Sequence, residues 1–472
     1  MADRTPTDLV VVLPGITGST LHKGGKPVWE PSGGALLNAL LTLGGSLRSL
    51  ALPAGIGDDH PGDGVTVGAL VDDVHVIPGI WTPIRGYTLT LERLRRLGYR
   101  EPTDDRPGNL LAMPYDWRLS NRYTAGWMAP TIERELGRWR GQGGRYADAT
   151  VTLVCHSMGG LVARWYAAHQ GAGLVGRIVT FGTPMRGSLN AVDQLVNGAP
   201  AKMGPLRGLI TDLGRSMPSL HQLLPSYACL VDGSGAEPEH LQPSSLPGVD
   251  STMAADALAF HEQLETAEAG NPAYASQLHA IVGTSQPTQS SVRVTGGGVE
   301  IYGTYGDDDF QGDGTVPLVG AVPKGVALDS NTLRRVPEQH GSLQCNSAAL
   351  DELEGILTAK RVVIKGGLQV PLSVTVPPIV GAGEPVRVEV AVGANRPALR
   401  ATLRRVDSGG PRGRARSRAL TIVDNVARAD FPDVPPGAYA VDVAGAPGAP
   451  VAPVSATTLV WDGGPQRRVA RR

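Results

Sequence analysis

The stretch VTLVCHSMGGLVARWYAAHQ, from Val151 to Gln170, decides the fold. It opens with a continuous apolar run, Val151 to Cys155, which is typical of a buried strand in a parallel sheet. From Met158 onward, apolar residues recur at helical spacing: Leu161, Val162, Trp165 and Tyr166. A second apolar run, GRIVTFG from Gly176 to Gly182, follows directly. Strand, helix and strand in this order predict a βαβ unit and a parallel sheet.

Ser157 stands at the predicted junction of strand and helix, and Gly159 and Gly160 follow it. A sharp turn there lifts the hydroxyl clear of the sheet and aims the Met158 amide at a developing oxyanion. The pattern G-x-S-x-G has a glycine two residues before the serine, where this chain has Cys155. Because the turn needs only a small residue there, the sequence predicts a nucleophile elbow, with Cys155 as inert packing and not as the nucleophile.

A serine hydroxyl needs a base, and in this fold an acid and then a histidine follow the serine along the chain. Asp313 lies between glycines in QGDGTVP, whereas the acids at 307–309 suggest a solvated loop. His340, the last histidine, lies in PEQHGSL between a predicted strand and a predicted helix. We expect His340 to take the Ser157 proton and Asp313 to fix the imidazole tautomer. A second oxyanion donor is expected from the loop LPGITGS, at the amide of Ile16.

Two further apolar runs, DLVVVLPG (Asp8 to Gly15) and QLHAIVG (Gln277 to Gly283), predict strands of the same sheet. The segment before the second run is too long for a plain connection and predicts a cap or lid at about 185–275. Beyond residue 359 the pattern changes to short alternating strands between Pro and Gly turns. The expected organisation is an α/β domain over 1–359 and an all-β sandwich over 360–472.

Composition narrows the class of protein. The chain has 472 residues and a net charge of −1, and the arginines of its basic C-terminal part are scattered, which does not favour nucleic-acid binding. Its 3 cysteines form neither a disulfide framework nor a metal-ligand spacing. A signal peptide and a bilayer-spanning run are not recognised, so the prediction is a soluble cytoplasmic protein. The abundance of Arg, Gly and Pro suggests a GC-rich bacterial source.

Six motifs then appear in a single order: LPGITGS, PYDWR (Pro114 to Arg118), CHSMGG, FGTPMRGS, MPSLHQLLP and GDGTVP. Together they resemble the lecithin:cholesterol acyltransferase and lysosomal phospholipase family of α/β-hydrolases, over about residues 8–345. The resemblance implies a triad of Ser157, Asp313 and His340, an oxyanion hole after Pro14 and Gly15, and lipid esters as substrates. For PYDWR we favour a structural role, in which Asp116 and Arg118 pair and Trp117 packs beneath the loop.

Contact with a lipid surface has one candidate segment, Gly33 to Gly55, whose leucines fall largely on one helical face. A cap helix buried over the active site is the alternative that we favour. The lipoprotein and lysosomal substrates of the secreted members do not carry over, because the signal peptide and the disulfide-bearing cysteines of those members are missing. The C-terminal part resembles immunoglobulin-like or carboxypeptidase-regulatory-like modules, which bind proteins or carbohydrate.

Three functional hypotheses follow from these observations. The first is a serine esterase of lipase or phospholipase A type, with an acyl-Ser157 intermediate that water resolves. The second is an O-acyltransferase with the same triad and an alcohol as acceptor. The third is a non-catalytic scaffold whose β domain binds a partner. We expect no cofactor and no metal, so that EDTA leaves the activity intact.

Overall fold

The structure, a computed structural model, describes residues 6–29, 48–72, 84–234, 237–271, 273–305, 308–330, 332–359, 369–392, 396–406, 414–446 and 449–461. Within these residues a central parallel sheet has the strand order β11-β8-β7-β6-β1-β5. Its strands are β1 (Leu9–Leu13), β5 (Leu110–Ala112), β6 (Val151–His156), β7 (Val175–Phe181), β8 (Leu278–Gly283) and β11 (Arg334–Val336). The four apolar runs of the sequence are therefore strands of one sheet.

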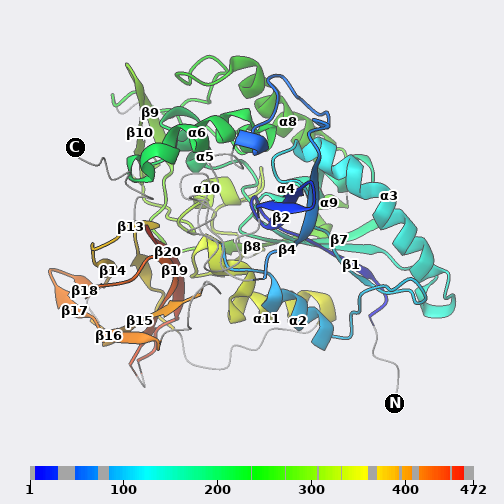
Figure 1. Cartoon of the computed structure of the whole chain (residues 1–472). Coiled ribbons are helices and arrows are strands. Elements are labelled where there is room, and N and C mark those ends of the chain that lie inside the picture. The colour runs from blue at the N-terminus through cyan, green and yellow to red at the C-terminus, as the bar shows by residue number, and fades with distance from the viewer. Residues whose placement is uncertain are drawn as a thin grey trace, which may run out of the picture.

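Helices cover both faces of this sheet (Figure 1). They are α2 (Thr88–Arg96), α3 (Asn121–Arg140), α4 (Gly159–His169) and α11 (Ser347–Thr358). Alternate residues of β1 divide between two buried clusters: Leu9 and Val11 pack with α3 and α4, and Val10 and Val12 pack with α2 and α11. The continuous apolar character of the strand follows from this burial on both sides. The architecture is that of an α/β-hydrolase.

Between β7 and β8 the chain leaves the sheet and forms a series of helices. These are α5 (Leu189–Val196), η2 (Ala201–Leu206), α6 (Arg207–Ser216), α7 (Pro218–His221), α8 (Ser251–Ala269) and α9 (Tyr274–Gln277). Asp250 caps the longest of them, α8, by accepting hydrogen bonds from the amides of Thr252 and Met253. This insertion occupies the segment expected to form a cap.

Smaller elements complete the hydrolase part. An antiparallel sheet follows β1 and contains β2 (Ser19–Lys23), β3 (Lys26–Trp29) and β4 (Val65–Leu70). After β8 come the hairpin β9 (Ser291–Thr295) and β10 (Gly298–Tyr302), and the short helix α10 (Leu318–Ala321). Two 3₁₀ turns are η1 (Gly144–Tyr146) and η3 (His340–Cys345). The turn η3 begins at the histidine that the sequence singled out.

The C-terminal residues form two further sheets around a core of their own, which we call the β module (residues 369–461). One sheet has the order β12-β14-β18-β17 and the other β13-β20-β19-β15-β16. The strands are β12 (Ser373–Thr375), β13 (Ile379–Gly381), β14 (Val386–Ala391), β15 (Leu399–Arg405), β16 (Arg416–Ala419), β17 (Thr421–Val423), β18 (Val426–Phe431), β19 (Gly437–Gly445) and β20 (Val454–Trp461). The inward residues of β14, which are Val386, Val388 and Val390, are fully buried in that core, as expected for alternating strands of a sandwich.

Two of the expectations concern membranes. Among the described helices, none combines the length and the apolar character that crossing a membrane requires. Most of the leucine-rich candidate at 33–55 lies outside the described residues, so its choice between a surface helix and a buried cap stays a prediction.

Candidate active site

Ser157 lies on a sharp turn between β6 and α4. Its backbone φ is +52°, in the left-handed region that side chains other than glycine rarely adopt. The turn brings the start of α4 against the loop after β1, and a Cβ at Gly159 would lie 2.4 Å from the Pro14 carbonyl oxygen. Glycine at this position is therefore a requirement of the close approach. The strain at the serine and this close approach are the features expected of a nucleophile elbow.

The structure brings Ser157, Asp313 and His340 together from three separate parts of the chain. The Ser157 Oγ lies 2.8 Å from His340 Nε2, and His340 Nδ1 lies 2.8 Å from Asp313 Oδ2. Ser157 and His340 have no exposed surface, and Asp313 is only 2% exposed. The three side chains are therefore closed off from solvent in this conformation.

Main-chain amides fix the Asp313 carboxylate. Its Oδ1 accepts hydrogen bonds from the amides of Thr315 and Val316, at 3.0 and 2.7 Å. This leaves Oδ2 for the imidazole, while the backbone amide of His340 donates to the Asp313 carbonyl at 2.8 Å. The two residues are thus joined by both side chain and main chain. This double connection sets the orientation of the ring.

The loop after β1 carries the expected oxyanion donor at Ile16. Among the described residues, the amides of Ile16 and Met158 have no protein acceptor. Both amides are therefore available to a ligand oxygen, as an oxyanion hole requires. Gly15 lies directly against the serine, since a Cβ there would be 2.9 Å from the Ser157 Cβ.

The PYDWR segment holds this loop from the side of β5. The Tyr115 hydroxyl donates to the Pro14 carbonyl at 2.7 Å, and the Tyr115 amide donates to the Ser19 hydroxyl at 3.0 Å. The buried Trp117 donates its indole N–H to the Ser19 carbonyl at 3.1 Å. The segment therefore holds the loop after β1 through hydrogen bonds and a buried ring, which fits the structural role favoured for PYDWR.

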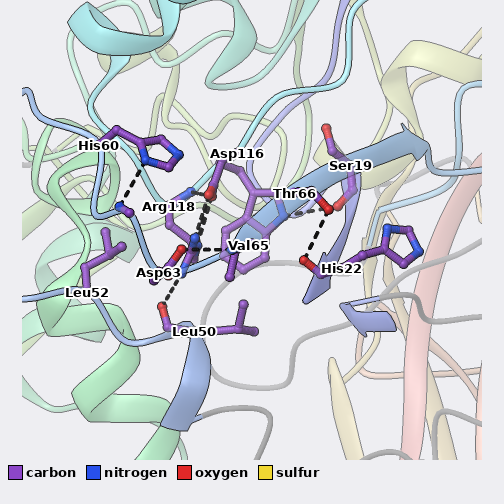
Figure 2. Close-up of polar contacts among 12 residues, drawn as sticks. Ser19, His22, Leu50, Leu52, His60, Asp63, Val65, Thr66, Asp116 and Arg118 are labelled. Carbon is purple, nitrogen blue, oxygen red and sulfur yellow. Dashed lines mark hydrogen bonds and ion pairs between the residues drawn. The ribbon is translucent and has the colours of Figure 1, made fainter. Parts of the chain in front are cut away.

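A buried ion pair anchors the segment itself. Figure 2 shows Asp116 and Asp63 directed at the Arg118 guanidinium, which lies 2.6 Å from Asp116 and 2.9 Å from Asp63. The same guanidinium donates to the Leu50 carbonyl at 2.9 Å. Burial opposes the charged form of Arg118, but the hydrogen bonds and charges of Asp116 and Asp63 outweigh it and raise the pKa. The expected pairing of Asp116 with Arg118 is confirmed.

A buried hydrogen-bond chain that the sequence did not predict links the loop after β1 to the histidine. The Gly15 amide donates to the Tyr87 hydroxyl at 2.8 Å, which lies 3.0 Å from His156 Nδ1. His156 Nε2 lies 3.1 Å from the His340 carbonyl. A carbonyl only accepts, so His156 Nε2 carries the proton and Tyr87 donates to Nδ1. These hydrogen bonds run from the loop after β1, through Tyr87 and His156, to the backbone of His340.

The ionisation of His156 fits this arrangement. Burial, with the neighbouring His340 as a second cause, lowers the pKa of His156 well below its usual value. The ring is therefore neutral at neutral pH and keeps one donor and one acceptor. Its position directly before Ser157 was the only signal in the sequence, and Tyr87 gave none.

Cys155 is fully buried in the same core cluster as α3 and α4. Burial raises the pKa of its thiol well above the usual value, which suppresses the reactive thiolate. Both observations fit packing and not nucleophilic chemistry. In the part of the chain that the structure describes, no group of three or more His, Cys, Asp or Glu side chains is arranged to hold a metal ion.

A comparison with protein-family models finds a match in this chain. Residues 82–252 match the model of the family described as lecithin:cholesterol acyltransferase. The resemblance drawn from the motifs is confirmed for this segment, which includes PYDWR and Ser157 but not Asp313 or His340. No curated protein matches the chain.

The solved structures that resemble this chain do so distantly, as two of them show. A chain of the Tle4–Tli4 complex shares 16% identity at a TM-score of 0.48, over 75% of this chain and 98% of that one. Phospholipase PlaB from Legionella pneumophila shares 9% identity at a TM-score of 0.28, over 97% of this chain and 92% of PlaB. At these scores neither structure carries an argument about activity.

Proposed function

We propose that this chain, with its lecithin:cholesterol acyltransferase segment at 82–252, is a serine hydrolase of carboxylic esters, with lipid esters as substrates. The observation that carries the proposal is the hydrogen-bond chain from Ser157 through His340 to Asp313, with the serine on a strained turn. The family match supports the choice of lipid esters, since the family takes its name from the transfer of acyl groups between lipids.

In the proposed reaction, Ser157 Oγ attacks the ester carbonyl carbon while His340 Nε2 takes the hydroxyl proton. Asp313 holds the opposite ring nitrogen and stabilises the imidazolium. The amides of Ile16 and Met158 donate to the oxyanion of the tetrahedral intermediate. His340 then returns the proton to the leaving alcohol as the C–O bond breaks, which leaves an acyl-Ser157.

The second half of the reaction repeats these steps with a new nucleophile. Water attacks the carbonyl carbon of acyl-Ser157 while His340 takes its proton. The bond to Ser157 Oγ then breaks, His340 returns the proton to Oγ, and the carboxylic acid leaves. An alcohol in the place of water would give a new ester, which is the O-acyltransferase alternative that the family match favours as second candidate. Both outcomes use the same residues and differ only in the acceptor.

The complete burial of Ser157 bears on how a lipid reaches it. Because the serine has no exposed surface, a water-soluble ester and a lipid in a vesicle both depend on opening of the covering segments. We propose that transient contact with a lipid surface accompanies this opening. The third hypothesis, a non-catalytic scaffold, gains no support from a site in which all three side chains are in hydrogen-bond contact.

The test is product analysis on phospholipid vesicles, with and without an added long-chain alcohol, beside a chain-length series of p-nitrophenyl esters. Free fatty acid as the product in both conditions supports the hydrolase. New ester formed at the expense of free acid when alcohol is present supports the acyltransferase. A folded protein that releases neither product from any of these esters contradicts the proposed function.

A further inference from the structure

The β module lies beside the β8 end of the central sheet and not beside β1 (Figure 1). Apolar side chains of the module join the same buried cluster as the hydrolase core: Ile379, Ala438, Leu459 and Trp461. An exposed ion pair also joins the two parts, between Lys202 of η2 and Glu384 of the module, at 3.0 Å. The β module is therefore packed against the hydrolase part. Its polar contacts identify the two loops of the hydrolase part that it touches.

The first polar contact reaches the loop that holds Asp313. The fully buried Gln286, just after β8, bonds with both atoms of its side-chain amide to the main chain of the module. It donates to the Leu372 carbonyl at 2.9 Å and accepts from the Val374 amide at 3.0 Å. The backbone of Gln286 in turn pairs with Gly312, the residue before Asp313, through two hydrogen bonds.

The second set of contacts reaches the loop that holds His340. Glu338 is buried and accepts a hydrogen bond from the Ser455 amide of β20 at 2.8 Å. Its other oxygen accepts from the Asn346 side chain, which caps α11. Gln339 donates its side-chain amide to the Val374 carbonyl at 3.0 Å. Both residues before His340 are thus bonded to the module.

In these hydrogen bonds the module uses main-chain atoms, and not side chains, to contact the two loops. Every hydrogen bond just described from Gln286, Glu338 and Gln339 to the module ends on a main-chain atom of the module. Main-chain atoms of a packed sheet are fixed in position, so they hold the side chains that bond to them. Val374 contacts both loops, with its amide on Gln286 and its carbonyl on Gln339. The edge of β12 therefore contacts both loops.

We propose that the β module holds the Asp313 and His340 loops in register with Ser157, with Gln286, Glu338 and Gln339 as positioning residues. The proposal rests on the proposed function, because it concerns the geometry of the same three side chains. It assigns the module a role inside the protein, in place of the external protein or carbohydrate partner that its sequence suggested. Small displacements of reacting groups are costly, since about 1 Å can lower a rate by ~10²-fold.

The test uses the full chain with Gln286→Ala, and Arg387→Ala as the matched control. Arg387 pairs with Asp430 of the same module at 2.9 Å, and both side chains are exposed. For Gln286→Ala we expect a kcat on p-nitrophenyl esters lowered by ~10-fold or more, with KM within about twofold. We also expect faster amide hydrogen exchange in residues 311–316 and 338–345. Arg387→Ala is expected to match the wild type in both measurements.

Three results would overturn the proposal: unchanged exchange in both loops, unchanged kcat despite faster exchange, or equal effects of the control. If Gln286→Ala does not fold, the milder Gln339→Ala, which removes one hydrogen bond at a half-buried position, takes its place under the same criteria. A wild type without ester turnover refutes the proposed function alone. The exchange measurement, which needs no substrate, then still decides whether the module restrains the loops.

Discussion

The two sides of the candidate site are built in different ways. The serine side is one continuous stretch, β6, the turn at Ser157 and α4, so its geometry is set by neighbours in the sequence. The other side, which holds the candidate acid and base, consists of two separate loops. They are joined by the Asp313–His340 contacts and bonded to the β module, which follows both of them in the chain. A sequence motif can predict geometry that neighbouring residues set. It cannot predict geometry that depends on partners far away in the chain. Variants on each side test this difference.

The largest effect is expected where the two sides meet. In the proposed reaction, His340→Ala removes the base that takes the Ser157 proton, and Asp313→Asn disturbs the tautomer that makes His340 a base. Each change is expected to lower ester turnover by ~10³-fold or more. Steady-state kinetics on p-nitrophenyl esters, beside circular dichroism to confirm folding, measures the loss. Near-normal turnover in either folded variant would show that the residue is not part of the machinery.

A smaller loss of activity is expected from the buried chain that links the two sides. Tyr87→Phe removes the hydroxyl between the Gly15 amide and His156, and leaves the Gly15 amide and His156 Nδ1 buried without a partner. We expect kcat/KM to fall by about 10-fold, because the oxyanion loop and the His340 backbone lose their connection. Phe at the neighbouring but exposed position, Leu89→Phe, is the control and should keep wild-type kinetics. If Tyr87→Phe and the wild type have equal kinetics, the hydrogen bonds through Tyr87 and His156 have no role in ester turnover.

The buried carboxyl group of Glu338, beside the His340 loop, is expected to make the stability of the protein depend on pH. Burial raises the pKa of Glu338 from 4.5 to about 7, against the lowering effect of its hydrogen bonds and of the nearby Arg85. Between these values the folded protein holds a proton that the unfolded chain has released. The stability from this group is therefore present below about pH 4.5 and is lost as pH rises to about 7.

Glu338→Gln removes this titration and nearly preserves the size of the side chain. The Tm of the wild type is expected to fall relative to that of the variant, on the order of 5 °C, as pH rises from 5 to 8. Differential scanning calorimetry across this range measures the difference. A Tm difference that is constant with pH, or one that grows in favour of the wild type, would contradict the raised pKa.

The smallest effect is expected on the serine side. Cys155→Ala shortens a buried side chain by one sulfur atom and leaves the backbone of the turn in place, so ester turnover should stay within about twofold of the wild type. A modest loss of Tm is expected from the missing packing. A large loss of turnover in a folded Cys155→Ala protein would mean that the thiol takes part in the chemistry.

The sequence predicted the serine side in detail. The stretch from Val151 to Gln170 predicts a strand, a turn and a helix, and the structure has these elements in this order. Asp313 and His340 were selected by chain order and by their glycine and loop settings, and the structure brings both to Ser157, although their catalytic role stays a prediction. PYDWR was expected to be structural, and its ion pair confirms that the loop is pinned.

What the sequence did not predict depends on contacts between distant residues. Tyr87 belongs to no motif, and only folding places its hydroxyl between Gly15 and His156. Gln286, Glu338 and Gln339 are polar residues in loops, where solvent exposure is the usual expectation. Their contacts with the β module arise from the packing of two parts that the sequence presents as separate. No periodicity within either part carries that information.

The central claim is that Ser157 is the nucleophile and that the His340–Asp313 pair activates it. Labelling of the folded protein with a fluorophosphonate, followed by peptide mass spectrometry, tests it most directly. The account predicts one adduct, on Ser157, which is lost in Ser157→Ala and kept in Cys155→Ala. An adduct that persists in Ser157→Ala, or a folded wild type that forms none, would contradict it.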